Sequence, residues 1–344
     1  MSPHDSLTEK LEHLSLPVKK NVKLAPYTTM GVGGKALLFV EVRTTSELEQ
    51  AITLALDESV PYMVMGRGSN LIISDHGYEG MVILNKADHW QILQNHAPAS
   101  PKNKVSSRFI SLDKSTGTAD LTYSDHDAED IVIRVESGIR MEFLIKALLK
   151  AGITGLQWFA GIPATVGGAV FMNIHGGNHF FADFVEQVCL TNGRITRTMN
   201  HDYFQFDYDW SILHQTGEIV LWTDLNLKKG DVHKAAALAR EWARQKANQP
   251  RRSAGCIFRN LTAAQQKQHN LPTPSVGYLV DKILNLKGKK CGDAIISPKH
   301  AAFIENLGKA SAADVMELIK LIQQRAREQL ELELKTEIQT IGKF

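Results

Sequence analysis

The chain has 344 residues, of which 43% are hydrophobic and 22% are charged, with 39 basic against 37 acidic side chains and a net charge of +2. This length predicts two or three domains, and the apolar fraction excludes a disordered chain. The balanced charge gives no basic field for nucleic acid or a membrane surface. The three cysteines, Cys189, Cys256 and Cys291, are widely spaced and odd in number, which is typical of a reducing cytoplasm rather than of a disulfide framework or a zinc site.

One long stretch, residues 151–174, carries no charge and is long enough to cross a bilayer. It contains Gln157, Pro163 and five glycines, however, and close basic residues do not flank it on both sides. The polar N-terminal segment lacks the apolar core of a signal peptide. We therefore expect a soluble cytoplasmic protein without a membrane span, and the uncharged run needs another explanation.

In the first part of the chain, a polar lead-in over residues 1–20 precedes short strands, one helix and glycine turns. This pattern predicts an α+β sheet rather than a doubly wound one. Residues 91–130 are polar and predict a surface insertion that contains a hairpin around 108–112 and 119–123. The expected elements are a strand over 36–42, a helix over 48–58 capped by Thr45 and Ser46, and strands over 61–66, 71–74 and 80–85.

In the second part of the chain, the composition changes near residue 231, and a helix that stops at Pro250 marks the boundary of a second module. The expected domains are 21–230, with the insertion, and 231–344. Before the boundary we expect a strand over 131–138, a helix over 141–152, a hairpin across Asn192-Gly193 and a strand over 218–227. After it we expect a helix over 276–285, strands over 291–297, 301–306 and 336–342, and a last helix that opens with Ser311 and Asp314 and buries Val315, Leu318, Ile319 and Ile322.

Three glycine-rich turns lie in the sheet-rich region, and none matches a P-loop or a strand-linked G-x-G-x-x-G motif. Glycine lets backbone N–H groups approach a diphosphate, and neutral side chains add further donors. Taken singly, each turn is better explained by a structural role than by phosphate binding. Together they favour a large ligand with an apolar ring and a diphosphate. The candidate residues are Gly31, Gly33 and Gly34, then Gly66, Arg67, Gly68, Ser69 and Asn70, then Gly161, Ile162, Thr165, Gly167 and Gly168.

Six segments, taken in their order along the chain, resemble a known family. The segments are YTTMGVGGKA, MGRGSNLIISDHGYEGMVI, GLQWFAGIPATVGGAVFMN, SAGCIF, HAAFIEN and TEIQTIG. Across residues 21–344 the sequence resembles the UDP-N-acetylenolpyruvylglucosamine reductase (MurB) family, as a divergent member. The glycine-rich segments are similar to the flavin domain of the vanillyl-alcohol-oxidase type, and the C-terminal module and TEIQTIG point to the reductase.

The resemblance implies an FAD-binding domain of two subdomains followed by an α+β substrate domain. It implies that NADPH reduces FAD and that hydride then passes to the enolpyruvyl methylene carbon of a nucleotide sugar, which makes UDP-N-acetylmuramate for peptidoglycan. Such chemistry needs a donor that stabilises enolate-like charge and a general acid. A monomer is favoured, and no metal is expected.

Two residues are implied for the catalytic step. Cys256 lies where the family usually has a serine that supplies the proton, and a thiol is also a proton donor. The alternative for Cys256 is a small buried apolar side chain. Glu337 matches the family glutamate that polarises or protonates the developing enolate, and its alternative is a solvated position on a strand. Tyr208, Arg259 and Asn260 fall on positions implied for substrate binding, although Arg259 and Asn260 are also ordinary loop residues.

Three positions depart from the family pattern. Asp209 stands where the resemblance implies the catalytic arginine, and Gln339 stands where a second arginine is often found. The third departure is the segment 173–179, in which His175 and His179 are spaced four apart. This spacing suits a metal pair only on a helix, which the intervening Gly-Gly argues against.

These departures leave other functions open. Arg251 and Arg252 are candidates to replace the lost cation. The alternatives are a flavin-binding paralogue without reductase activity, or a flavin oxidoreductase that acts on another substrate.

Overall fold

The computed structural model describes residues 2–93, 123–125 and 127–344. The chain divides into two compact units, each built from separate stretches of sequence. Unit 1 contains residues 1–18, 40–66 and 83–246, and unit 2 contains residues 19–39, 67–82 and 247–344. The four strands β1 (Val18–Lys23), β2 (Lys35–Val42), β5 (Tyr78–Asn85) and β3 (Tyr62–Met65) form one sheet in the order β1-β2-β5-β3.

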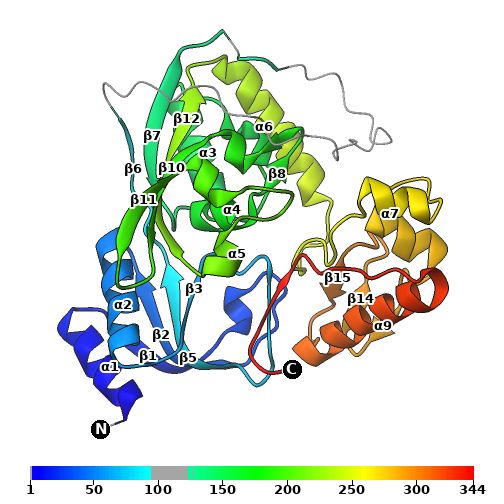
Figure 1. The fold of residues 1–344 in the computed structure, drawn as a ribbon, viewed down its shortest axis with the longest axis horizontal. Coiled ribbons are helices and arrows are strands. Elements are labelled where there is room, and N and C mark those ends of the chain that lie inside the picture. The colour runs from blue at the N-terminus through cyan, green and yellow to red at the C-terminus, as the bar shows by residue number, and fades with distance from the viewer. Residues whose placement is uncertain (1, 94–122, 126) are drawn as a thin grey trace. The chain divides into compact units, whose positions relative to one another are not determined.

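Unit 1 contains a five-stranded antiparallel sheet in the order β11-β10-β12-β7-β6 (Figure 1). The longest register joins β12 to β7, from the pair Trp222–Glu136 to the pair Lys228–Asp130. The strands are β6 (Trp90–Ile92), β7 (Asp130–Glu136), β10 (Val185–Thr191), β11 (Thr196–Asn200) and β12 (Ile219–Lys228). The predicted hairpin across Asn192-Gly193 is confirmed as the turn between β10 and β11.

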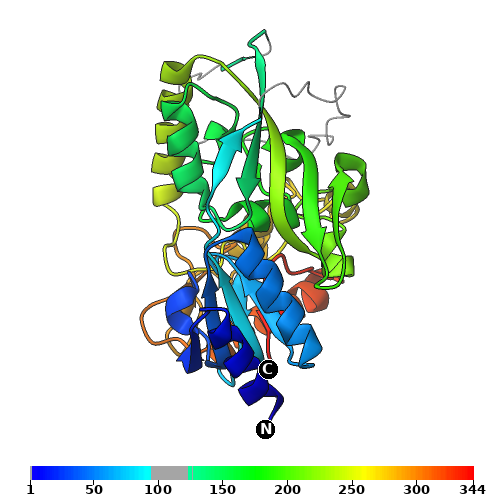
Figure 2. The same cartoon turned by 90° about the vertical axis from the view of Figure 1, so that its left-hand side faces the viewer.

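Helices cover one face of this sheet, where α3 and α6 lie together in Figure 2. The hydrophobic core between them and the sheet includes Leu144, Leu148, Ile133 and Leu225, all buried. The helices of unit 1 are α1 (Pro3–His13), α2 (Thr45–Asp57), α3 (Met141–Lys150), α4 (Val166–Met172), α5 (Leu213–Thr216) and α6 (Val232–Ala247). A short hairpin, β8 (His175–Gly176) with β9 (His179–Phe180), follows α4.

Unit 2 is organised around α9 (Ala312–Leu330), which packs on a three-stranded sheet in the order β13-β14-β15 (Figure 1). The predicted capping box is confirmed, because Ser311 Oγ accepts from the Asp314 amide and Asp314 accepts from the Ser311 amide. The remaining elements are α7 (Ala263–Gln268), α8 (Val276–Tyr278), β13 (Lys290–Cys291), β14 (Ala294–Ile296), β15 (Ile304–Asn306), and the parallel pair β4 (Leu71–Ile73) and β16 (Gln339–Ile341).

The structure differs from the sequence expectations in the N-terminal lead-in and at the cap of α2. The predicted lead-in contains α1, which Ser2 caps and which buries Leu7 and Leu11. The cap of α2 is Thr44 rather than Thr45 or Ser46, because the Thr44 hydroxyl accepts from the Glu47 amide. The hairpin predicted around 108–112 and 119–123 lies almost wholly outside the described residues.

The uncharged run 151–174 holds a 3-10 turn and the short α4 rather than one long helix. Within the described part of the chain, every helix is too short or too polar to span a bilayer.

Candidate functional site

Two glycine turns of unit 2 lie against each other. The Thr29 amide donates to the Gly68 carbonyl at 3.2 Å, and the Thr29 hydroxyl donates to the Ser69 carbonyl at 3.5 Å. Gly68 is buried with a φ of +58°, and a side chain there would overlap the carbonyl of Tyr27. Only glycine therefore allows the 66–70 turn to approach the 28–34 segment this closely.

These turns present backbone donors. Among the residues that the structure describes, none accepts a hydrogen bond from the amides of Val32, Gly33, Gly68 or Ser69. Val32, Gly33 and Gly68 are buried, and a buried amide without an acceptor is rare unless a ligand or water satisfies it. A group of backbone amides with no acceptor in the protein suits a phosphate. The turns 28–34 and 67–70, which we call the turn pair, therefore fit a diphosphate.

Asn306, at the end of β15, holds the turn pair from behind. Its Nδ2 donates to the Met30 carbonyl at 3.0 Å, and its Oδ1 accepts from the amides of Gly308 and Ala310 at 2.8 and 3.0 Å. Asn306 is 4% exposed. The sequence placed Asn306 only within a family-like segment and gave it no role, because its partner Met30 is 276 positions away.

The turn at 67–70 leads directly to the predicted catalytic glutamate. Asn70 Nδ2 donates to the Glu337 carbonyl at 3.1 Å, and the Gln339 amide donates to the Asn70 carbonyl at 2.9 Å. These bonds start the parallel pairing of β4 with β16. The turn and Glu337 thus belong to one rigid piece of unit 2.

Glu337 and Cys256 lie on neighbouring backbone segments. The Glu337 amide donates to the carbonyl of Ile257 at 2.9 Å, and Phe258 forms a bridge with Thr336. Cys256 itself is a partly exposed free cysteine that bridges to Phe303. The structure therefore brings together two residues that are 81 positions apart (337 − 256) in the sequence.

Arg259 and Asn260 continue the same segment. The Arg259 amide donates to the Lys335 carbonyl at 3.0 Å. Asn260 Oδ1 accepts from the Val276 amide at 3.1 Å, at the start of α8. This oxygen of Asn260 therefore positions the start of α8. The sequence did not reveal this structural role.

The other predicted cofactor residues are in unit 1, around α4. Thr165 caps α4 by accepting from the Gly168 amide at 3.4 Å, and a side chain at Gly66 would overlap Thr165. Gly167 faces Ser137, whose carbonyl accepts the Gly167 amide at 2.8 Å. Gly161 lies against α6, and Ile162 is partly buried in the core of unit 1. Gly66, Gly167 and Gly161 therefore all permit close packing.

The far end of α4 holds a second cluster. Asn173 ends the helix in a left-handed conformation, and its Nδ2 donates to the Asp207 carbonyl at 2.8 Å. Ser211 Oγ donates to the Phe171 carbonyl at 2.7 Å. Both bonds fix the loop 207–211 to the C-terminal end of α4.

His175 and Asp209 meet in this cluster. His175 Nδ1 lies 3.0 Å from Asp209 Oδ1, and the Tyr208 ring stacks on the imidazole with centroids 5.1 Å apart. The Asp209 side chain is 5% exposed and that of His175 is 33% exposed. Two of the three departures from the family pattern, Asp209 and the segment with His175, are therefore in contact with each other. The sequence analysis treated them separately, and their spacing of 34 residues gave no signal.

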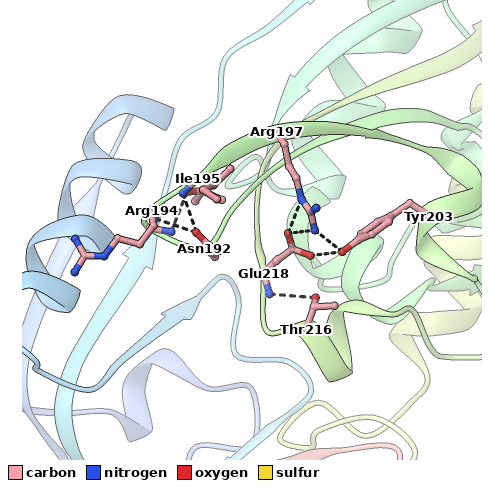
Figure 3. Close-up of polar contacts among 9 residues, drawn as sticks. Asn192, Arg194, Ile195, Arg197, Tyr203, Thr216 and Glu218 are labelled. Carbon is pink, nitrogen blue, oxygen red and sulfur yellow. Dashed lines mark hydrogen bonds and ion pairs between the residues drawn. The ribbon is translucent and has the colours of Figure 1, made fainter.

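An ion-pair cluster around the buried Glu218 closes the chain segment that carries Tyr208 and Asp209 (Figure 3). Arg197 donates to Glu218 Oε1 through Nε at 3.0 Å and through a terminal nitrogen at 2.7 Å, and the Tyr203 hydroxyl donates to Glu218 Oε2 at 2.5 Å. Burial acts to raise the pKa of Glu218, but the bonds from Tyr203 and Arg197 outweigh it and lower that pKa below its usual value.

The two histidines of the β8–β9 hairpin have different carboxylate partners. His175 pairs with Asp209, and His179 lies 3.6 Å from Asp183. In the described stretches of the chain, no three His, Cys, Asp or Glu side chains are grouped to hold a metal ion.

The chain is similar to known proteins over almost its whole length. Residues 245–341 match the model of the C-terminal domain of UDP-N-acetylenolpyruvoylglucosamine reductase, and residues 109–198 match an FAD-binding domain. The reductase of Chlamydia felis is 32% identical over 92% of this chain and 92% of its own length, and that of Anoxybacillus flavithermus is 32% identical over 95% of each. The chain belongs to the UDP-N-acetylenolpyruvoylglucosamine reductase family.

A solved structure supports the same assignment. The reductase MurB of Thermus caldophilus superimposes with a TM-score of 0.69 at 31% identity, and the match covers 95% of this chain and 100% of that chain. The predicted fold class, an α+β flavoprotein with an FAD-binding domain and a C-terminal domain, is confirmed. The site residues and domain boundaries stay predictions.

Proposed function

We propose that the chain is an FAD-dependent reductase that uses NADPH to convert UDP-N-acetylglucosamine enolpyruvate into UDP-N-acetylmuramate, in the synthesis of peptidoglycan precursors. The observation that carries the proposal is the bond from the Glu337 amide to the Ile257 carbonyl. It holds two groups that this reduction needs, a thiol and a carboxyl group, on adjacent segments. We expect the protein to act in the cytoplasm as a monomer. Its partner is the small-molecule substrate, this nucleotide sugar.

The residues of the turn pair would hold the diphosphate of FAD; they are Gly31, Gly33, Gly34, Arg67, Gly68, Ser69 and Asn70. We also assign Gly66, Gly161, Ile162, Thr165, Gly167 and Gly168 to this cofactor. Bound FAD would supply the hydride, which it receives from NADPH.

The chain's own residues would complete the reaction after hydride reaches the methylene carbon. The adjacent carbon then carries enolate-like charge. Glu337 would polarise the developing enolate, and the Cys256 thiol would donate its proton to this carbon. Solvent then reprotonates the thiolate. Tyr208, Arg259 and Asn260 would hold the substrate, and Oδ1 of Asn260 also accepts from the Val276 amide.

An anaerobic stopped-flow experiment tests the proposal in two phases. NADPH should bleach the flavin absorbance, and the enolpyruvyl sugar nucleotide should then restore it. Cys256→Ala should slow the second phase by about 10²- to 10⁴-fold, which is the usual contribution of a general acid, whereas Cys256→Ser should stay within about tenfold of the wild type. Cys291→Ala is the matched control, because Cys291 is also a partly exposed free cysteine.

Asp209 motivates the alternatives, a flavin-binding paralogue without reductase activity or an oxidoreductase for another substrate. A flavin that NADPH bleaches but the enolpyruvyl sugar nucleotide does not reoxidise would reject the proposed substrate. If Asp209→Arg then restored reoxidation, the chain would be a reductase that has lost its activity.

A further inference from the structure

Two segments of unit 1 pair with each other at the start of α4. Residues 164–168, which we call the cofactor segment, include Thr165, Gly167 and Gly168, and we assign these three residues to FAD. Residues 137–141, which we call the support segment, follow directly after β7. The pairing includes backbone hydrogen bonds of 3.0 Å from Met141 to Ala164 and from Val166 to Ile139. The support segment therefore fixes the position of the cofactor segment.

The amide of Thr165 points away from this pairing. Arg140 and Thr165 form a bridge, and the bonds of Met141 and Val166 lie on either side of it, so the N–H groups of the bridged pair face outward. Within the described stretches of the chain, no group accepts a hydrogen bond from the Thr165 amide, although Thr165 is only 6% exposed. The amides of Val166 and Gly167 donate to carbonyls of the support segment. The Thr165 amide is thus a buried donor that remains for a ligand.

Ser137 begins the support segment and contacts the cofactor segment directly. The Ser137 amide donates to the Leu221 carbonyl on β12 at 3.0 Å, and the Ser137 carbonyl accepts from the Gly167 amide at 2.8 Å. A methyl group at Gly167 would lie only 3.0 Å from the Ser137 Cβ. Because this packing leaves no free space, any shift of Ser137 would be passed on to Gly167.

Asn85, the last residue of β5, holds the side chain of Ser137. Asn85 Nδ2 donates to Ser137 Oγ at 2.8 Å, and Asn85 Oδ1 accepts from the Ala87 amide at 3.0 Å. Asn85 is 6% exposed and Ser137 is 2% exposed, so water does not replace these bonds when they are lost. A side chain at Gly138 would overlap Asn85 Oδ1 and the Ala87 backbone, so the chain has glycine where this contact needs space.

We propose that Asn85 and Ser137 are positioning residues for the flavin cofactor. Their side-chain bond fixes the start of the support segment, and the support segment in turn aims the Thr165 amide at FAD. This inference rests on the cofactor residues assigned under the proposed function. Neither of the two side chains touches FAD, and all the residues that carry this arrangement belong to unit 1.

The first test measures FAD affinity by flavin fluorescence during titration of the apoprotein. Ser137→Ala removes the acceptor of Asn85 Nδ2, and Asn85→Ala removes the donor. Each variant should bind FAD about fivefold to twentyfold more weakly, the effect expected when one buried hydrogen bond no longer supports the bound state. The double variant should bind FAD about as weakly as the weaker single variant, because both substitutions break the same bond. If Asn85→Ala does not fold, Ser137→Ala carries the measurement, since it removes a single oxygen atom.

Thr223→Val is the matched control. Thr223 lies on β12 in the same sheet, is 0% exposed, and donates through its hydroxyl to the Gln187 carbonyl at 3.1 Å. The substitution therefore also removes a buried hydroxyl of unit 1, and urea denaturation should show a loss of stability like that of Ser137→Ala. FAD affinity should nevertheless stay within about twofold of the wild type. Equal weakening of FAD binding in Thr223→Val would assign the effect to stability alone and overturn the positioning role.

The second test follows the cofactor segment itself by amide hydrogen exchange. In the wild type, FAD should slow exchange of the Thr165 amide by about tenfold or more, because this amide has no acceptor in the described protein. In Ser137→Ala saturated with FAD, this slowing should be smaller, whereas Thr223→Val should retain it in full. A merely structural role of Ser137 would not change the protection of this one amide by the ligand.

Both tests work without turnover, so their outcomes are separate from those of the proposed reaction. If the enolpyruvyl sugar nucleotide does not reoxidise the wild type, the proposed reaction is wrong, while weaker FAD binding by the two variants still supports the positioning role. If FAD leaves exchange in residues 164–168 of the wild type unchanged, or if both single variants bind FAD as tightly as the wild type, the positioning role is wrong.

Discussion

The turn pair of unit 2 and the His175–Asp209 cluster of unit 1 are built from different kinds of groups. The turn pair presents backbone amides, and its close approach depends on glycine and on one buried side chain, Asn306. In the cluster, side chains make the contacts: His175 is hydrogen-bonded to Asp209 and stacks on Tyr208. The first region keeps the family pattern, whereas the second departs from it.

The difference teaches how each region can change during divergence. Backbone amides are the same in every residue, so a site made from them limits the sequence only where a side chain would collide or where an anchor is needed. A site made from side chains changes its chemistry with each substitution. A new carboxylate at position 209 would be a buried charge that needs a partner, and His175 supplies one. The two departures are therefore best understood as a coupled pair.

The comparison predicts its largest effect at Asn306, the anchor of the turn pair. Asn306→Ala should lower the free energy of unfolding by about 3–4 kcal/mol, because three buried hydrogen bonds of about 1–1.5 kcal/mol each are lost. FAD should also dissociate more readily, since the 28–34 segment loses its support. Urea denaturation of the apoprotein and flavin fluorescence measure the two effects.

Asn192 provides the matched control for this prediction. Its Oδ1 also accepts from two backbone amides, those of Arg194 and Ile195, both at 2.9 Å, but it lies in an exposed hairpin turn (Figure 3). Asn192→Ala should cost less than about 1 kcal/mol, because water replaces the lost bonds. Equal losses in the two variants would show that burial of Asn306 does not matter.

An intermediate effect is expected at Glu218, which closes the segment that carries Tyr208 and Asp209. Glu218→Gln should destabilise the protein by about 2 kcal/mol at pH 7, because a buried charged hydrogen-bond acceptor becomes neutral. Amide hydrogen exchange in residues 205–216 should accelerate more than elsewhere. Glu79→Gln is the control, since Glu79 forms an ion pair with Lys343 at an exposed site, where such pairs contribute less than about 1 kcal/mol.

The acid dependence of this effect follows from the lowered pKa of Glu218. A carboxyl group whose pKa is lower in the folded state stabilises the protein above its unfolded pKa, which is about 4.3 for glutamate. That contribution disappears as the pH falls through the folded pKa. The difference in unfolding free energy between wild type and Glu218→Gln should therefore be largest near neutral pH and shrink below pH of about 4. A difference that grows towards acid pH would contradict this assignment.

What the sequence could predict depends on the distance between interacting residues. The capping box of Ser311 and Asp314 and the turn at Asn192-Gly193 involve residues at most three positions apart, so local patterns were sufficient. The glycine turns were visible in the sequence itself, and the resemblance added the catalytic candidates. It also located position 209 as a departure, although it gave no partner for the new carboxylate.

The remaining features could not be read from local patterns. Asn306 and Met30 are separated by 276 positions, and His175 and Asp209 by 34, so only the folded chain brings them together. The helix α1 was missed for another reason. Its many charged residues hide the pair Leu7 and Leu11, although the spacing of four and the Ser2 cap were visible signals.

The smallest effect is expected at Gly168. A substitution there tests whether backbone amides of α4, in unit 1, also take part in ligand binding. A methyl group at Gly168 would meet only the Thr165 hydroxyl at an ordinary 3.5 Å, so the protein itself has room for alanine. Gly168→Ala should leave the apoprotein unchanged or stabilise it by up to about 1 kcal/mol, because alanine has less freedom to lose in a helix.

FAD should nevertheless bind more weakly to Gly168→Ala, by about tenfold or more, if the cofactor approaches the helix backbone at this position. Gly167→Ala is the contrasting variant, because its methyl group would lie 3.0 Å from the Ser137 Cβ and 3.1 Å from the Ser137 carbonyl. That variant should lose stability before any effect on FAD is measured. Thermal unfolding of the apoprotein and flavin titration together separate the two cases. Unchanged FAD affinity in Gly168→Ala would remove this glycine from the cofactor site, whereas weaker binding by a protein of undiminished stability is an effect that only a ligand at Gly168 explains.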